Sequence, residues 1–340
     1  MIVTHLESIR SALERAMDRD SRVVLLGQDI ADPYGGAFKV TRGLSTDFPG
    51  RVINTPISEA SITGLASGMA LQGLHPILEI MFGDFLTLCA DQVINHASKF
   101  CSMYRDIDTL PMVMRVATGG YRGYGPTHSQ NTEKLFFGFP GVTIIAPSCF
   151  HDSGLLLEKA IESQEFTLFM EHKLLYAQEV INTDRGSHYH GFQLSRKDST
   201  IDETVVLTPC EQGEAPMITI VTYGGISSKV FSAARAVLLE EDITCEIVVP
   251  ALIKPLQMDD IVESARRSGR VLIVEETHRS WGWGAEVAAQ AGQNCFQSLR
   301  CPVARLAAKD VLIPSARPLE NEVLPQVEDV VQELLKLARA

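Results

Sequence analysis

The sequence has few of the features that mark secreted or membrane-spanning proteins. Its seven cysteines are an odd number without a repeated spacing, so they predict neither a disulfide framework nor a zinc site, and we expect them to be reduced. No stretch reaches the roughly 18 apolar residues that a membrane span requires. The amino-terminal residues lack a basic start followed by an apolar run. We therefore expect no signal peptide and a cytoplasmic location, unless a transit peptide has been removed.

Positive charge is also in short supply. Lys and Arg number 30 against 42 Asp and Glu, which gives a formal net charge of −12. This balance argues against a nucleic-acid partner, because such proteins present a basic face. Hydrophobic residues make up 45% of the 340 residues, a composition typical of a folded chain with a large core. The length is ample for two domains.

What the sequence does contain is an alternation of apolar β-type runs and stretches of helical length. Continuous apolar strands separated by helices predict an α/β fold of the Rossmann-like kind, with parallel sheets covered on both faces. The strands expected first are 22–27, 75–82, 111–117, 142–146 and 166–171, and the helices are 59–73, 85–103 and 150–163.

The composition changes after this first run of elements. The segment from Asn182 to Gly191 is polar and rich in turn residues. A second alternation follows it, with strands expected at 217–223, 244–249 and 270–275 and helices at 227–241, 259–268 and 283–291. We therefore predict one domain over 1–180, a linker over 181–205 and a second domain over 206–340.

Glu59 opens the predicted helix 59–73, whose body is small and apolar and which leads directly into the next strand. The helix dipole favours an anionic carboxyl group there, whereas burial favours the neutral acid. A carboxyl group in this position can share a proton with a basic ring nitrogen. Most glutamates at helix N-termini only stabilise the helix through its dipole, and for Glu59 taken alone that interpretation stays open.

Further motifs follow along the chain in a fixed order. They are Gly27-Gln-Asp29 with Gly35 to Leu44, Asp91 to Asn95, His128-Ser-Gln130, Pro140-Gly141, Ala146-Pro147, Ile253 to Leu256, Gly284-Ala-Glu286 and Asp310 to Pro314. With the segment around Glu59, they make the chain from about Ser21 to Val331 resemble the β subunits of the E1 component of 2-oxoacid dehydrogenases. These β subunits belong to the branch of the transketolase superfamily that is divided into two polypeptides. The resemblance implies a transketolase pyrimidine-binding domain followed by a transketolase C-terminal domain.

The resemblance also implies a cofactor, thiamine diphosphate, and a role for Glu59. In enzymes that use this cofactor, a glutamate protonates N1′ of the aminopyrimidine ring and so activates the cofactor to lose its C2 proton. Ile57, Met81 and Phe85 match positions that line the same pocket, Phe85 by packing against the aminopyrimidine ring. A core phenylalanine at the start of a helix is the competing interpretation of Phe85.

A glycine-rich loop follows the strand predicted at 111–117 and so belongs at the carboxyl end of the sheet, where ligands bind in open α/β folds. Its His128 can exchange protons with a substrate carbonyl or carboxylate near neutral pH. The preceding residues, Gly125-Pro-Thr, resemble the transketolase and deoxyxylulose-phosphate synthase version of the loop. Gln28 likewise stands where many β subunits have Glu, and Ser315 to Arg317 replace a usual Pro- and aromatic-containing stretch.

The Gly-Asp-Gly motif with which thiamine-diphosphate enzymes hold Mg²⁺ is missing, and Gly83-Asp84-Phe85 is the nearest match. Mg²⁺ needs hard oxygen ligands beside the phosphates. The chain therefore resembles half of an active site, which binds the pyrimidine while a separate α subunit of an α₂β₂ heterotetramer binds the diphosphate and Mg²⁺. Some E1 β subunits also hold a structural K⁺ through main-chain oxygens, at positions that match Met112, Ala160, Ile161, Ser163 and Glu165.

Three functional hypotheses follow. In the first, the chain is the β subunit of an enzyme that decarboxylates a 2-oxoacid and passes the acyl unit to a lipoyl group on an E2 partner; Glu59 activates the cofactor and His128 assists proton or acyl transfer. The second, favoured by the Gly-Pro-Thr-His loop, is a two-component acyloin synthase or transketolase-like transferase that adds the unit to an aldehyde. The third is a non-catalytic scaffolding or regulatory subunit, against which the intact Glu59, Phe85 and His128 argue.

Overall fold

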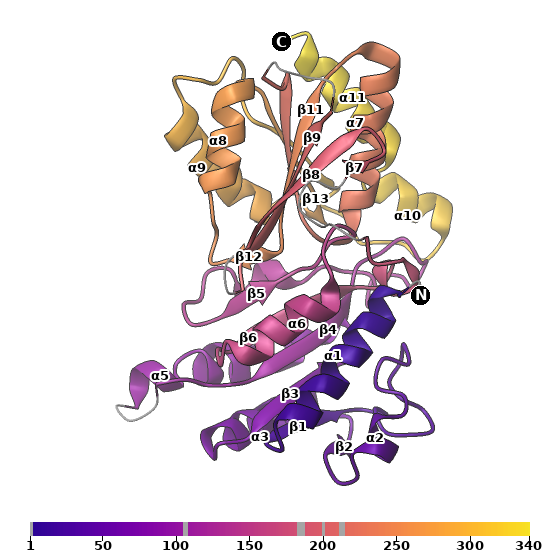
Figure 1. Cartoon of the computed structure of the whole chain (residues 1–340), viewed down its shortest axis with the longest axis vertical. Helices are drawn as coiled ribbons and strands as arrows, with labels where there is room; N and C mark the ends of the chain where they lie inside the picture. Colours follow the sequence, from indigo (N-terminus) through magenta and orange to yellow (C-terminus); the bar gives the residue numbers. More distant parts are fainter. Residues whose placement is uncertain (1–2, 105–107, 182–187, 199–200, 211–214) are drawn as a thin grey trace. The chain divides into compact units, whose positions relative to one another are not determined.

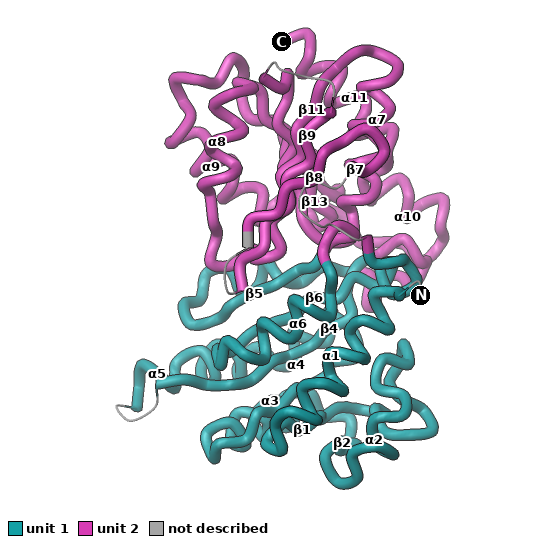
Figure 2. Tube along the Cα trace, viewed as in Figure 1, with its two compact units in different colours: residues 1–119, 130–147, 152–180 teal, residues 120–129, 148–151, 181–340 magenta. Residues whose placement is uncertain are grey.

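The computed structural model describes residues 3–104, 108–181, 188–198, 201–210 and 215–340. Contacts divide the chain into two compact units (Figures 1 and 2). Unit 1 comprises residues 1–119, 130–147 and 152–180, and unit 2 comprises residues 120–129, 148–151 and 181–340. Each unit is built around a sheet that helices cover, which confirms the predicted α/β fold class.

The strands of unit 1 are all parallel and lie in the order β5-β6-β4-β3-β1-β2. Four of them (β1, β4, β5 and β6) are buried at every position, which explains their continuous apolar sequences. Their bounds are β1 (Val23–Gly27), β2 (Val52–Asn54), β3 (His75–Ile80), β4 (Val113–Thr118), β5 (Thr143–Ile145) and β6 (Thr167–His172).

The predicted helices 59–73 and 150–163 are present in unit 1, whereas the single helix expected over 85–103 is divided. There the Ser98 hydroxyl donates to the Ile94 carbonyl over 2.9 Å, and such side-chain bonds distort a helix. The helices at 5–19 and 44–47 lie outside the prediction. The α-helices are α1 (His5–Arg19), α2 (Leu44–Asp47), α3 (Glu59–Leu71), α4 (Leu86–Asp91), α5 (Phe100–Met103) and α6 (Ser153–Glu162). The other helical turns are η1 (Gly83–Phe85), the π-helical η2 (Gln92–Ala97), η3 (Glu133–Phe136) and η4 (Leu175–Ala177).

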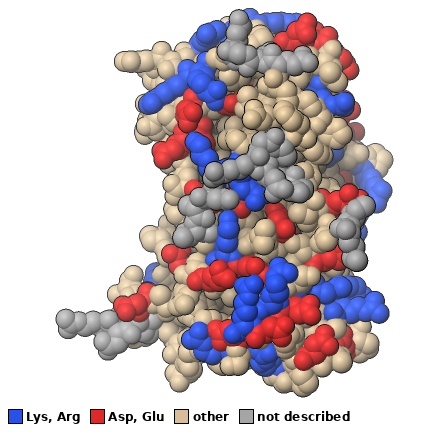
Figure 3. Space-filling model, viewed as in Figure 1, with Lys and Arg blue, Asp and Glu red and all other residues tan. Residues whose placement is uncertain are grey.

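Helices α1 and α6 lie side by side over the sheet of unit 1 (Figure 1). Arg15 and Arg19 of α1 pair with Glu158 and Glu162 of α6, so basic and acidic side chains are interleaved on this face (Figure 3). Beneath them, Nδ1 of the buried His5 lies 2.7 Å from the Ser153 hydroxyl oxygen. The two helices are therefore joined by charge at the surface and by a neutral hydrogen bond in the core.

The sheet of unit 2 has the strand order β14-β13-β10-β11-β9-β8-β7. Strands β13, β10 and β11 match the predicted strands and are parallel, and β14, which was not predicted, is parallel to β13. Strands β9, β8 and β7 extend the sheet with antiparallel pairs. The bounds are β7 (His188–Tyr189), β8 (Phe192–Asp198), β9 (Glu203–Pro209), β10 (Ile218–Thr222), β11 (Cys245–Pro250), β13 (Val271–His278) and β14 (Ala304–Ala308), with a further short strand β12 (Leu252–Lys254).

Helices cover both faces of this second sheet: α8 and α9 pack together on one face, and α7 and α11 pack together on the other (Figure 1). The helical elements are η5 (Gly224–Ile226), α7 (Ser227–Glu241), α8 (Asp259–Ser268), α9 (Trp283–Cys295), α10 (Arg317–Val323) and α11 (Val327–Ala338).

The segment 181–205, which we predict as a linker, has a different character in its described part. Its residues form β7 and β8 and the start of β9, and all three strands belong to the sheet of unit 2. Phe192 and Leu194 alternate inward along β8, but this short pattern is obscured by the polar residues before it. The domain boundaries at 180 and 206 stay a prediction.

All seven cysteines are free thiols. Burial raises the pKa of the Cys89 thiol to about 11 and that of the Cys149 thiol to about 12, so both behave as small core residues. In the described part of the chain, no helix has the length and apolarity that a bilayer crossing needs.

His5 contributes stability that depends on pH. Burial lowers the pKa of its imidazole from 6.5 to about 4, and its Nε2 is buried without a hydrogen-bond partner among the described residues. The folded chain therefore binds this proton less readily than the unfolded chain. The contribution is complete above pH 6.5 and is lost as the pH falls toward 4; it totals about 3 kcal/mol at 1.36 kcal/mol per pKa unit.

We expect His5→Asn, which cannot titrate, to flatten the fall in melting temperature between pH 6.5 and pH 4 relative to wild type. His190→Asn is the matched control, because His190 is exposed and Asn tolerates its φ of 46°. The control should follow the wild-type pH profile. Parallel profiles for all three proteins would show that His5 is not the source of this pH dependence.

Candidate functional site

Glu59 is the first residue of α3, and it is 6% exposed. Gln28, directly after β1, donates from Nε2 to Oε1 of Glu59 over 3.1 Å. Gln28 is the sole hydrogen-bond partner of this carboxyl group among the described residues, and it binds only Oε1. The Thr63 hydroxyl donates to the main-chain carbonyl of Glu59 over 2.7 Å and so secures the first turn of the helix.

A close approach of two backbones places Gln28 at this point. A Cβ on Gly27, the last residue of β1, would lie 3.0 Å from the Glu79 carbonyl oxygen on β3 and 2.9 Å from Cγ2 of Ile30. Any larger residue would push the end of β1 away from its neighbours. Glycine at position 27 therefore lets the chain turn at the carboxyl edge of the sheet, the edge at which open α/β folds bind ligands.

The other residues predicted for the pocket lie after the same ends of the strands. Ile57, in the connection from β2 to α3, is 84% exposed, and Met81 follows β3 and is half-buried. Phe85 closes η1, is also half-buried, and packs edge-to-face on Phe82 with ring centroids 5.8 Å apart. The half-buried ring of Phe85 is not enclosed as a core phenylalanine would be. Unit 1 thus presents a buried carboxyl group and partly open apolar side chains at one edge of its sheet.

His128 lies in the loop 120–129, which belongs to unit 2 by its contacts (Figure 2). Its ring is half-buried, and Nδ1 lies 2.9 Å from the Thr127 hydroxyl oxygen. The loop bends at Gly123 and Gly125, whose φ angles of 71° and 81° are those that glycine adopts most readily. The main-chain N–H of His128 donates to the Gly125 carbonyl over 3.3 Å, which ties the histidine to this bend.

The two units match two family models, the transketolase pyrimidine-binding domain over residues 3–178 and the transketolase C-terminal domain over residues 211–330. Over 340 residues the chain is 34% identical to the pyruvate dehydrogenase E1 component subunit beta of Rickettsia bellii, with 99% of each chain covered. The chain belongs to the E1 β subunits of the 2-oxoacid dehydrogenases.

This E1 β subunit has relatives with other names. It is 32% identical to the acetoin:2,6-dichlorophenolindophenol oxidoreductase subunit beta of Cupriavidus necator, over 95% of this chain and 94% of that one. A solved structure described as a split-gene transketolase, inactive beta4 tetramer, shares the fold with a TM-score of 0.74 at 20% identity, and 99% of both chains is covered. The predicted class, a two-component thiamine-diphosphate enzyme acting on 2-oxoacids, is confirmed at the level of the family.

Asp84, in the segment nearest to a Gly-Asp-Gly motif, is held inside this E1 β subunit. Its Oδ1 accepts a hydrogen bond of 2.7 Å from Nε2 of Gln130, and its Oδ2 is buried. The Thr132 hydroxyl also donates to the Gly83 carbonyl over 2.7 Å. In the described part of the chain no group of three or more His, Cys, Asp and Glu residues could hold a metal ion. The donor set of Asp84 therefore does not fit a diphosphate-bound Mg²⁺.

A buried network of charges, which the sequence did not lead us to expect, supports the same edge of the sheet. Arg115 on β4 binds both carboxyl oxygens of Glu171 at 2.7 and 2.8 Å and Oε2 of Glu79 at 2.9 Å, and the Tyr176 hydroxyl donates to Glu171 over 2.7 Å. Burial raises the pKa of Glu79, and the charge of Arg115 opposes the effect. A Cβ on Gly36 would lie 2.9 Å from Oε1 of Glu79, so the network also packs against the start of the motif from Gly35 to Leu44. Glu79 and Arg115 are register partners on neighbouring strands β3 and β4, a pairing that follows from the strand order and not from the sequence alone.

The residues predicted to hold K⁺ lie around the end of α6 and the starts of β4 and β6. Ala160 and Ile161 are in the last turns of α6, Ser163 caps the helix, and Met112 precedes β4. The Ala160 carbonyl accepts from the Ser163 hydroxyl over 2.9 Å, and the Met112 carbonyl accepts from a main-chain N–H over 2.9 Å. The K⁺ site, which also includes Glu165, stays a prediction.

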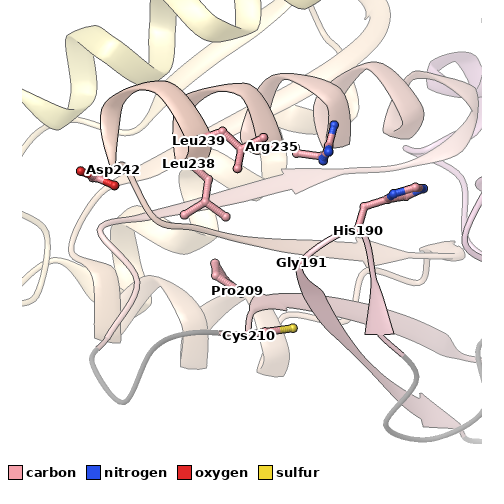
Figure 4. A pocket seen from close by; sticks show the side chains of 8 residues that line it. All are labelled: His190, Gly191, Pro209, Cys210, Arg235, Leu238, Leu239 and Asp242. Atoms are coloured by element: carbon pink, nitrogen blue, oxygen red, sulfur yellow. The ribbon is translucent and has the colours of Figure 1, made fainter.

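Unit 2 also contains an open cavity of about 390 Å³ between α7 and the ends of β8 and β9 (Figure 4). Its lining residues are His190, Gly191, Pro209, Cys210, Arg235, Leu238, Leu239 and Asp242. Nearby, Nδ1 of His188 lies 3.1 Å from the sulfur of Cys210. None of the residues predicted to act in catalysis or cofactor binding lines this cavity.

Proposed function

We propose that this E1 β subunit binds the pyrimidine half of thiamine diphosphate at Glu59, while a partner α subunit holds the diphosphate and Mg²⁺. The observation that carries the proposal is the asymmetry of the Glu59 carboxyl group: one oxygen is fixed by Gln28 and the other has no partner among the described residues. A basic ring nitrogen is the group that would complete it. The partly open side chains of Met81 and Phe85 suit the apolar faces of a pyrimidine ring.

When bound, thiamine diphosphate would supply a nucleophilic carbon for addition to the 2-oxo group and a cationic ring as the sink for the electron pair left when CO₂ departs. Glu59 holds the proton that N1′ of the pyrimidine ring needs, at Oε2, because Gln28 occupies Oε1. We propose that His128 exchanges a proton at Nε2 with the carbonyl oxygen or carboxylate of the substrate. Its Nδ1 is engaged by Thr127, and this hydrogen bond sets the orientation of the ring.

The acyl acceptor in this proposal is a lipoyl group on an E2 partner. Transfer to an aldehyde, as in an acyloin synthase or a transketolase-like enzyme, is the second candidate, and Gly125-Pro126-Thr127 favours it. Product analysis with the co-expressed α subunit and a panel of 2-oxoacids, with and without a lipoylated acceptor, separates the two. The bound K⁺ and the cytoplasmic location stay predictions.

Glu59→Gln tests the central assignment. The amide keeps the shape and can still form a hydrogen bond with N1′, but it cannot supply the carboxyl proton. We expect hydrogen–deuterium exchange at C2 of the bound cofactor, in the assembled complex, to slow by about 10²–10⁴-fold, the usual range for general acid–base contributions. Glu158→Gln, at the surface pair with Arg15, is the control and should exchange at the wild-type rate. Equal exchange rates in both variants would leave Glu59 as a helix-terminal carboxylate only.

We also propose that the small residues of α3, glycines and alanines, pack closely against another subunit, and Gly68 tests this contact. The residue is exposed, and a Cβ there would meet nothing within 4 Å in the chain itself, so Leu fits the isolated chain. Gly292 within α9 is equally open and makes a matched control, because both changes remove a helical glycine. We expect Gly68→Leu to fold but to fail in assembly by light scattering, and Gly292→Leu to assemble. Normal assembly of Gly68→Leu would argue against a subunit contact at this face.

A further inference from the structure

The loop that carries His128 lies directly on the segment 315–324 of unit 2. A Cβ on Gly120 would lie 2.5 Å from Cδ1 of Leu324, and one on Gly123 would lie 2.9 Å from the Ser315 carbonyl oxygen. A side chain at position 123 would meet main chain, and one at position 120 would have to displace the Leu324 side chain. The two glycines therefore let the loop backbone approach the segment 315–324 closely enough for its N–H groups to be bound by side chains of unit 2.

Two buried carboxylates bind these N–H groups. The Gly123 N–H donates to Oε2 of Glu320 over 2.9 Å, and the Gly120 N–H donates to Oε1 of Glu276 over 2.6 Å. Glu320 is 0% exposed, and its Oε1 has no hydrogen-bond partner among the described residues. Burying a carboxylate with so few partners is costly, and a hydrogen bond to a charged group is about twice as strong as a neutral one. The arrangement holds the loop backbone in place, and the desolvation of the buried Glu320 carboxylate lowers the stability of the fold.

Tyr121 fastens the same loop by its side chain. Its hydroxyl donates to the Pro325 carbonyl over 2.8 Å, its ring packs on a buried apolar cluster that includes Leu324, and Nζ of Lys229 lies 4.6 Å from the ring centroid. Burial raises the pKa of the Tyr121 phenol, and the charges of Glu276 and Glu320 add to this effect. The hydroxyl therefore stays protonated and keeps its role as a donor.

A short path leads from these anchors to the histidine. Gly123 is bound by Glu320, a Cβ on Gly125 would lie 3.3 Å from Cβ of Ser315, and the Gly125 carbonyl accepts from the main-chain N–H of His128. A displacement of the loop at Gly123 would therefore move the bend on which His128 depends.

We propose that Glu320 and Glu276 are positioning residues, which hold the loop 120–129 through its main-chain N–H groups and so keep His128 in place for its reaction step. This inference rests on the proposed role of His128. The two carboxylates of the C-terminal domain would contribute to catalysis through the loop, without touching the substrate. Oriented groups of this kind matter because a misplacement of about 1 Å can reduce a rate by about 10²-fold.

The test compares Glu320→Ala and Glu320→Gln in the complete complex with the α subunit. For Glu320→Ala we expect faster amide hydrogen exchange in the loop peptide 120–129, a kcat reduced by about 10²-fold with a smaller change in KM, and unchanged exchange at C2 of the cofactor, because Glu59 is untouched. Glu320→Gln should recover most of kcat, since its amide oxygen can still accept the Gly123 N–H. If Glu320→Ala does not assemble, Glu320→Asp, which keeps the charge but shortens the reach, carries the same expectations.

Glu246→Ala is the control for general destabilisation. Glu246 is a buried carboxylate of the same unit, and it accepts from the Thr208 hydroxyl over 2.9 Å without contacting the loop. It should lower the melting temperature but leave kcat and the loop exchange at wild-type values. Equal losses of kcat in Glu246→Ala and Glu320→Ala would show that Glu320 only stabilises the fold, and would overturn the proposal.

Variants of His128 distinguish the proposed role of His128 from the positioning role of Glu320. His128→Ala should lower kcat, and adding Glu320→Ala to it should lower kcat little further, because both changes act on one group. If His128→Ala is slow but Glu320→Ala retains wild-type kcat and loop exchange, the positioning role is wrong while the proposed function stands. If His128→Ala is itself silent, the proposed role of His128 fails and the positioning role fails with it.

Discussion

The hydrogen bond between Gln28 and Glu59 joins the end of β1 to the first turn of α3, and the arrangement of the site depends on it. It fixes one oxygen of a buried carboxyl group and leaves the second without a partner in the described chain. This state is the basis of the proposal that Glu59 binds a ligand and does more than stabilise the helix.

The surroundings of this bond keep the backbone rigid at the edge of the sheet. Glycine at position 27 allows the close approach of β1 to β3, and Arg115 binds two carboxylates, those of Glu171 and of Glu79, which lies against Gly36. A buried ion pair of this kind contributes little net stability, yet breaking it is strongly destabilising. The charges are thus better understood as fixing the positions of the loops than as stabilising the fold.

The fold and the chemical class were largely readable from the sequence, because buried parallel strands are continuous apolar runs and because Glu59 lies in a motif of fixed order. The strands β7 and β8 were missed, since their short alternation follows a polar stretch that is typical of a linker. The division of the helix expected over 85–103 depends on a local bond from Ser98. The pairing of Arg115 with Glu171 was beyond reach for another reason: it joins residues far apart in sequence, and only the strand order brings them together. The same holds for Glu320, whose contact with the His128 loop arises from tertiary structure alone.

In the proposed function, this chain binds one half of the cofactor and the α subunit binds the other. The most direct measurement is a calorimetric titration of thiamine diphosphate with Mg²⁺ into the purified chain, and into the same chain mixed with its α subunit. We predict weak binding and no activity for the chain alone, because Asp84 is engaged inside the protein, and tight, Mg²⁺-dependent binding for the mixture. Tight, Mg²⁺-dependent binding by the chain alone would contradict the account.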